Sequence, residues 1–181
     1  MDLYLLRHGD VGKRISLVND AALTESGKKE VAIIARSFKE LNQDVSTILT
    51  SPLKPAVQTA RILAEALSMK VKVLACDELA PEGSVIQLSD RLRHYPLDSS
   101  ILIVGHEPYL TNMIYEIIFH VNRTNSRRKT REMRMGSPES IILKKAGIAK
   151  LRIKSMTPNL EGEMHWLMTP RIMKLIQGGQ K

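Results

Sequence analysis

Three short apolar segments of the chain each end at a motif of polar and turn-forming residues. The motifs are Arg7-His8-Gly9 after residues 3–6, Ser51-Pro52-Leu53 after residues 46–49, and Gly105-His106-Glu107-Pro108 after residues 101–104. Short apolar runs that end at glycine or proline, with helical patterns between them, are typical of buried parallel strands. Ligands bind outside the carboxyl ends of the strands in such sheets. We therefore expect the arginine and the two histidines to face one crevice.

The rest of the chain alternates between strand and helix patterns, which predicts an α/β fold. The pattern predicts strands over residues 2–6, 46–50, 71–74 and 101–105, and helices over 24–41, from Pro55 to about 67, over 84–94 and after Pro108. Three extended pieces, at 140–143, 149–154 and 164–168, are expected to add antiparallel strands at an edge, before a last helix near Pro170. The prediction is a three-layer sandwich, with a mostly parallel sheet and helices on both faces, in a single domain over residues 1–181.

Composition narrows the class of protein. The chain has 181 residues, of which 43% are hydrophobic, enough for one domain with a full core. Cys76 is the only cysteine, so an intrachain disulfide and a cysteine-based metal site are excluded. No apolar run approaches the roughly 20 residues that cross a membrane, and the chain enters a strand at once without a signal peptide. We expect a cytoplasmic protein with no membrane partner.

The excess positive charge is local. The net charge is +8, and most of it falls in residues 120–135, where one acidic residue, Glu132, stands against six cations: Arg123, Arg127, Arg128, Lys129, Arg131 and Arg134. We interpret residues 121–137 as a basic loop insertion, because strand patterns resume after it. Such a loop can bind nucleic acid through its charge or dock an acidic protein, and a solvated loop is the alternative.

Histidine and arginine together suit the transfer of a phosphoryl group. A neutral imidazole can attack phosphorus, while an arginine holds the phosphoryl oxygens in a planar fork. Arg7 and His8 offer both roles in neighbouring residues, Gly9 lets the backbone approach a ligand, and His106 can donate to the same group. The alternative is that His8 and His106 are two separate structural histidines.

The chain resembles the histidine phosphatase superfamily, which has the phosphoglycerate mutase-like fold, and within it the small SixA-type branch of phosphohistidine phosphatases. The matching segments, in family order, are residues 5–10 (LLRHGD), 23–27 (LTESG), 51–60 (SPLKPAVQTA), 79–83 (LAPEG), 104–108 (VGHEP) and 166–170 (WLMTP). They span nearly the whole chain apart from the basic segment.

The resemblance implies a mechanism and a substrate. His8 would be the nucleophile that becomes phosphorylated, and Arg7 and His106 would bind the transferring group. Water would then hydrolyse the phosphohistidine, with no metal or other cofactor. The substrate would be a phosphorylated histidine on a protein. A small phosphorylated molecule is the alternative, for which members of the larger branch use a glutamate as general acid; Glu82 is the candidate by position.

Two positions depart from the family pattern. Members usually carry one arginine before the Leu-Thr turn, where this chain has Ala21-Ala22, and a second at the position of Pro55. Three cations could replace them in binding phosphate: Lys54, Lys13 and Arg14. Without replacement, the fold would serve as a phosphate- or phosphoprotein-binding module rather than an enzyme.

Overall fold

Six strands form one mixed sheet in the order β3-β2-β4-β1-β5-β6. The computed structural model describes residues 1–12, 21–41, 43–67, 71–119 and 140–178. The strands are β1 (Asp2–Arg7), β2 (Thr47–Thr50), β3 (Lys72–Ala75), β4 (Ser100–Gly105), β5 (Ile148–Ser155) and β6 (Glu161–Met168). Strands β3, β2, β4 and β1 are parallel, and β5 and β6 add an antiparallel edge next to β1.

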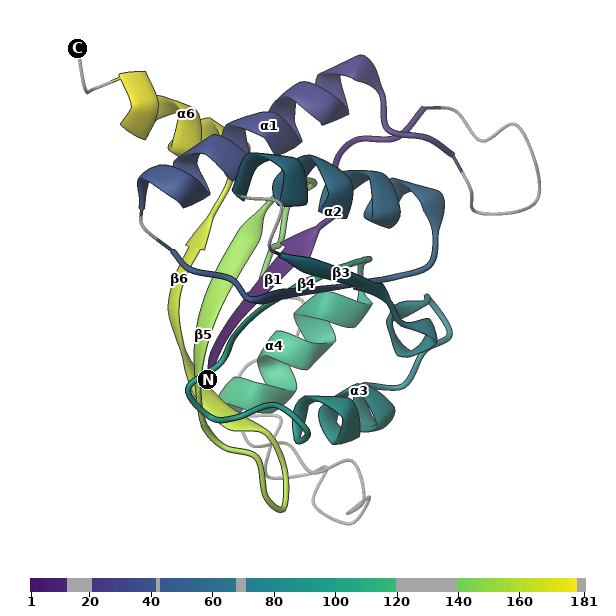
Figure 1. Cartoon of the computed structure of the whole chain (residues 1–181), viewed down its shortest axis with the longest axis vertical. Helices are drawn as coiled ribbons and strands as arrows, with labels where there is room; N and C mark the ends of the chain where they lie inside the picture. Colours follow the sequence, from purple (N-terminus) through teal and green to yellow (C-terminus); the bar gives the residue numbers. More distant parts are fainter. Residues whose placement is uncertain (13–20, 42, 68–70, 120–139, 179–181) are drawn as a thin grey trace.

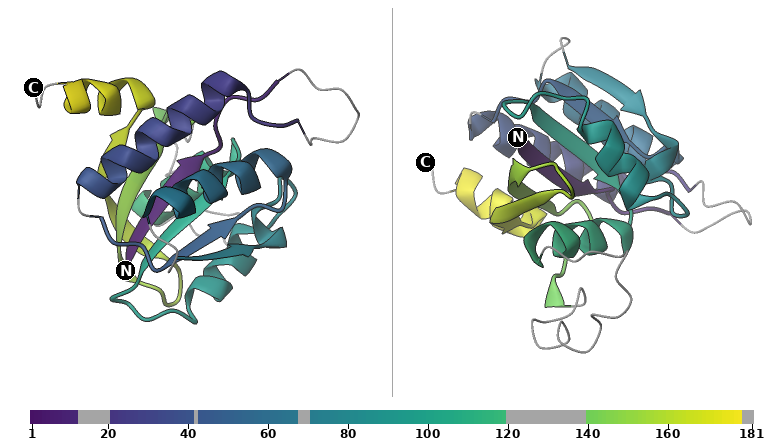
Figure 2. Two further views of the ribbon diagram at one scale, coloured as in Figure 1. Left: turned by 45° about the horizontal axis from the view of Figure 1, so that its top comes forward. Right: turned by 90° about the horizontal axis from the view of Figure 1, so that it is seen from below.

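Helices cover both faces of the sheet, so the molecule has three layers (Figures 1 and 2). The helices α1 (Glu25–Glu40), α2 (Lys54–Leu67) and α6 (Pro170–Gly178) lie on one face. The helices α3 (Val85–Leu92) and α4 (Tyr109–Phe119), with the short 3-10 helix η1 (Asp77–Leu79), lie on the other. The predicted three-layer α/β sandwich with a mostly parallel sheet is confirmed.

Successive side chains of a strand point to opposite faces of the sheet, so the central strands contribute to a hydrophobic core on each face. Leu3 and Leu5 of β1 point toward α3 and α4, whereas Tyr4 and Leu6 point toward α1 and α2. All four are at most 1% exposed. Strand β4 is likewise buried on both faces and lies inside the sheet, as its hydrophobicity predicts.

Capping residues fix where the helices begin. Thr24 accepts a hydrogen bond from the amide of Gly27 and begins α1, and Ser84 accepts one from Gln87 and begins α3. Helix α2 begins at Lys54, one residue before the proline that the sequence analysis chose.

One predicted strand was wrong. Residues 140–143 form no strand, and the carbonyl of Leu143 accepts a hydrogen bond from Nη1 of Arg7 at 3.0 Å. An extended apolar pattern does not indicate which group will hydrogen-bond to the backbone. Here the carbonyl of Leu143 bonds to an arginine side chain and not to a neighbouring strand.

Three sequence predictions fall outside the described residues. They are the basic loop at 121–137 and the two candidate cations Lys13 and Arg14. Within the described ranges, no helix has the length and apolar character needed to cross a bilayer.

Candidate active site

The ends of β1 and β4 bring the two predicted histidines together. The strands pair in parallel with Arg7 opposite Gly105, and the amide of His8 donates to the carbonyl of Gly105 at 3.1 Å. His8 directly follows β1, and His106 directly follows β4. The ring centroids of His8 and His106 lie 4.9 Å apart at an interplanar angle of 56°. The two imidazoles therefore lie next to each other at one edge of the sheet.

A cavity of about 290 Å³ surrounds these rings. Its lining residues come from distant parts of the chain: Arg7, His8, Val11, Ala21, Leu53, Pro55, Pro81, His106, Glu107 and Lys145. The wall includes the start of α2, whose backbone amides and dipole favour an anion. The cavity thus combines two imidazoles, two cations and a helix N-terminus.

A backbone hydrogen bond fixes the tautomer of His8. Its Nδ1 lies 2.7 Å from the carbonyl oxygen of Gly9. A carbonyl oxygen only accepts, so Nδ1 carries the proton and Nε2 keeps its lone pair while the ring is neutral. Burial lowers the pKa of His8, and the charges of Arg7 and Lys145 lower it further, against the opposing effect of the Gly9 bond. Near neutral pH the ring is therefore neutral, with the lone pair of Nε2 available.

Ser51 holds His106. The hydroxyl oxygen of Ser51 lies 2.8 Å from Nε2 of His106, and both side chains are buried. Burial, followed by the neighbouring His8 and Arg7, lowers the pKa of His106 from 6.5 to about 4. The Ser-Pro-Leu turn therefore contributes a side chain that orients the second histidine, a role the sequence analysis did not give it.

Two charged side chains at the cavity keep buried atoms unpaired. Nε of Arg7 and Oε1 of Glu107 find no hydrogen-bond partner among the described residues. Burial raises the pKa of Glu107, although a hydrogen bond from Thr111 opposes this. Unpaired buried polar atoms are costly in a folded protein, and a bound oxyanion would give the arginine nitrogen its partner.

Gly9 is needed for close packing behind His8. A Cβ at this position would lie 2.9 Å from Cγ2 of Val31 and 3.0 Å from the carbonyl oxygen of Gly27. The amide of Gly9 donates to Oγ1 of Thr59 at 3.2 Å. The residue anchors the loop after β1 to α1 and α2, so its part in the site is to place His8.

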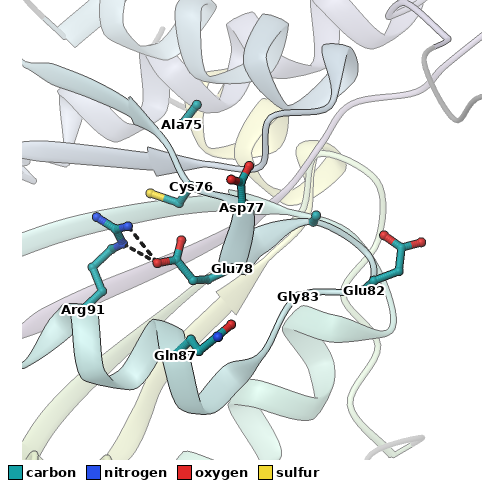
Figure 3. A pocket seen from close by; sticks show the side chains of 9 residues that line it. Ala75, Cys76, Asp77, Glu78, Glu82, Gly83, Gln87 and Arg91 are labelled. Atoms are coloured by element: carbon teal, nitrogen blue, oxygen red, sulfur yellow. Dashed lines mark hydrogen bonds and ion pairs between the residues drawn. The ribbon is translucent and has the colours of Figure 1, made fainter.

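The other predicted residues lie elsewhere. Lys54 is exposed and is not among the residues that line the cavity. Glu82 is exposed and lines a second hollow, beside Glu78 and Arg91 (Figure 3). Both remain predictions about function, but neither side chain belongs to the wall around the histidines.

Lys145 is the cation that the sequence analysis missed. It follows the basic segment and precedes β5, far from the three motifs in the chain. Because β5 runs antiparallel to β1, residues before β5 lie at the edge where β1 ends. A search for cations just before the antiparallel strands would have found it.

Comparisons with known proteins agree with this geometry. Residues 3–80 match the sequence profile of the histidine phosphatase superfamily, branch 1. An uncharacterised protein of Picosynechococcus sp. is 31% identical over 184 residues, which cover 94% of this chain and 98% of that protein. Phosphohistidine phosphatase SixA of Escherichia coli is 25% identical over 119 residues, or 65% of this chain and 74% of that one.

A solved structure of the protein histidine phosphatase SixA in complex with tungstate has the same fold. It superimposes with a TM-score of 0.77 at 22% identity, covering 96% of this chain and 99% of that one. The chain belongs to the histidine phosphatase superfamily and is SixA-like within it.

Proposed function

We propose that this protein is a phosphatase that forms a phosphohistidine at His8 and acts on phosphohistidine in proteins. The observation that carries the proposal is the fixed tautomer of His8, together with the ring of His106, whose centroid lies 4.9 Å from that of His8. Membership of the superfamily and the SixA relatives support the same chemistry.

In the first half-reaction, the lone pair of His8 Nε2 attacks phosphorus. The new bond joins Nε2 to phosphorus, and the bond between phosphorus and the leaving atom of the substrate breaks. Arg7 and His106 would hold the phosphoryl oxygens, since both line the cavity. In this step the Ser51 hydroxyl would donate to Nε2 of His106, so that the neutral ring carries its proton on Nδ1 and donates it to an oxygen.

In the second half-reaction, a water oxygen attacks the phosphorus of phospho-His8. The bond to Nε2 breaks, its electron pair returns to the ring, and phosphate leaves with a proton from the water; the second proton passes to solvent. The hydrogen bond from Nδ1 to Gly9 keeps the ring in place through both steps.

The leaving group favours a phosphohistidine substrate. An imidazole that carries a proton on its other nitrogen leaves as a neutral molecule, so it needs no general acid. An alcohol leaves as an alkoxide and needs one. Glu82, the expected acid, is not among the residues that line the cavity.

A small phosphomonoester is the second candidate substrate. The half-buried carboxyl of Glu107, whose pKa burial raises, lines the cavity and could supply the proton for an alcohol. Glu107→Gln separates the two candidates, because it would slow cleavage of a phosphoester and leave cleavage of phosphohistidine nearly unchanged.

The test is transient labelling with phosphate-32 from phosphoramidate or from a phosphohistidine-bearing phosphotransfer protein. Wild-type protein should form an acid-labile, alkali-stable adduct and release inorganic phosphate. His8→Ala should do neither, whereas His94→Ala, a change in an exposed histidine of the α3 end, should behave as wild type. Full turnover by His8→Ala would reject the mechanism, and binding without any hydrolysis by wild type would favour a phosphate-binding module.

A further inference from the structure

The geometry points to Lys145 as a phosphoryl-binding residue of this site, held in position by Asp10. This inference rests on the proposed function and adds a residue to it. Lys145 would donate to a phosphoryl oxygen from the rim of the cavity, and so would supply positive charge where Ala21 and Pro55 supply none.

The backbone places Lys145 beside the nucleophile. The amide of Ala146 donates to the carbonyl of His8 at 3.1 Å, and the amide of Arg7 donates to the carbonyl of Gly147 at 3.0 Å. Ala146 is fully buried and has a φ of 51°, which costs a residue other than glycine on the order of 1 kcal/mol. Two backbone hydrogen bonds thus hold the turn that carries Lys145 against Arg7 and His8.

An ion pair sets the position of the ammonium group. Nζ of Lys145 lies 2.5 Å from Oδ1 of Asp10, and Oδ2 of Asp10 accepts from the hydroxyl of Thr24 at 3.2 Å. Thr24 in turn caps α1 through the amide of Gly27. The carboxylate is therefore held at two oxygens, and it holds the lysine at the mouth of the cavity.

The pair leaves Lys145 free to bind a second anion. An ammonium has three donors, and Asp10 uses one of them in the described residues. The side chains of Lys145 and Asp10 are 46% and 37% exposed, so a ligand can reach them. A dianionic phosphoryl group attracts the ammonium more strongly than a single carboxylate does, and Lys145 can bridge the two.

The charges that line the cavity favour a binding role for this lysine. Among the described lining residues, Arg7 and Lys145 are the ones with a full positive charge at neutral pH, because burial keeps both histidines neutral. Nη1 of Arg7 is already bonded to the carbonyl of Leu143. A phosphoryl group with two or more negative charges needs more than one such cation.

The experiment compares two lysines of the same turn. Lys145→Met removes the charge and keeps most of the stem, and Lys144→Met makes the same change at an exposed neighbour that does not line the cavity. Affinity for inorganic phosphate, measured by calorimetry, and kcat/KM for the phosphohistidine protein are determined for both and for Lys145→Arg.

We expect Lys145→Met to lower phosphate affinity and kcat/KM about tenfold or more, Lys145→Arg to restore most of both, and Lys144→Met to match wild type. Equal values for the two methionine variants would overturn the inference while leaving His8 chemistry intact. If wild type shows no turnover at all, the proposed function fails and the phosphate affinities still decide the part of Lys145.

Two further measurements keep the test independent of folding. In wild-type protein, the NMR signal of the Lys145 ε-methylene should shift on adding inorganic phosphate; a shift at His8 without one at Lys145 would contradict direct binding. As a positioning residue, Asp10 should act through the lysine, so Asp10→Asn should weaken phosphate binding in wild type and have little effect in Lys145→Met. Equal effects in both backgrounds would remove Asp10 from the inference.

Discussion

Among the hollows that the described residues form, the one around Arg91 and the one around the histidines differ in how their arginine is satisfied. The larger, of about 490 Å³, lies between β3, η1 and α3 (Figure 3). There Arg91 donates from Nε at 3.1 Å and from Nη2 at 2.7 Å to one oxygen of Glu78, and this bond lowers the pKa of the carboxyl. The one cation among the described residues of that hollow is thus already paired with a carboxylate of the same wall.

The histidine cavity is smaller, about 290 Å³, and its polar groups are not all satisfied. Arg7 Nε and Glu107 Oε1 are buried without a partner among the described residues, and both imidazoles are held neutral. Of the two hollows, the first has the larger volume, but the chemistry of the second fits an anionic ligand better. Buried groups that await a partner mark a ligand site better than volume does.

The sharpest way to break this comparison is to remove one arginine from each hollow. Arg7→Met should lower kcat/KM by about 10²–10³, because a preorganised donor to the phosphoryl group is lost. Arg91→Met should leave kcat/KM within about twofold of the wild-type value, since the guanidinium of Arg91 forms an ion pair with Glu78. Steady-state kinetics with a phosphohistidine substrate measure both; a similar loss in the two variants would mean that the second hollow takes part in catalysis.

The depressed pKa of His106 predicts a pH-dependent stability. Its pKa of about 4 in the folded protein lies below the 6.5 that is usual for a histidine in an unfolded chain. Between these values the unfolded chain binds more protons, so the free energy of unfolding falls as the pH falls from about 6.5 to 4. The loss should reach up to about 3 kcal/mol.

Urea unfolding at pH 7 and pH 4.5 tests this contribution. His106→Gln should lose less stability between the two pH values than wild type does, whereas His94→Gln, at an exposed position, should show the wild-type difference. An unchanged difference in His106→Gln would show that the imidazole is not held neutral by burial.

A smaller effect is expected at the residue that orients His106. Ser51→Ala removes the hydroxyl 2.8 Å from Nε2 and should lower kcat/KM about tenfold, because the ring is no longer held for the phosphoryl group. Ser89→Ala in α3, which does not line the histidine cavity, removes only a bond to the carbonyl of Val85 and should keep wild-type kinetics. Wild-type kcat/KM in Ser51→Ala would contradict the role given to the serine.

The smallest effect is expected for the paired charges of the larger hollow. The side chains of Arg91 and Glu78 are 39% and 19% exposed, so solvent screens their attraction. A double-mutant cycle with Arg91→Met and Glu78→Gln should give a coupling of at most about 1 kcal/mol in the free energy of unfolding. A larger coupling would mean that this pair is a structural centre rather than a surface ion pair.

Secondary structure could be predicted well because it depends on local patterns. Each strand and helix expected before Pro108 is present, and Thr24 caps α1 as the hydroxyl before an apolar stripe predicts. The expectation failed at residues 140–143, where the pattern was extended but the backbone partner was the side chain of Arg7. Local sequence indicates conformation, whereas the choice of hydrogen-bond partner depends on what the fold brings nearby.

The sequence by itself determined that His8 and His106 would meet. Parallel strands present their carboxyl ends at one edge, so two histidines placed directly after such strands must share that edge. Only the tertiary structure decided which cation joins them. Lys54, adjacent to a motif in the chain, is exposed outside the cavity, while Lys145 lines it, because antiparallel β5 begins where β1 ends.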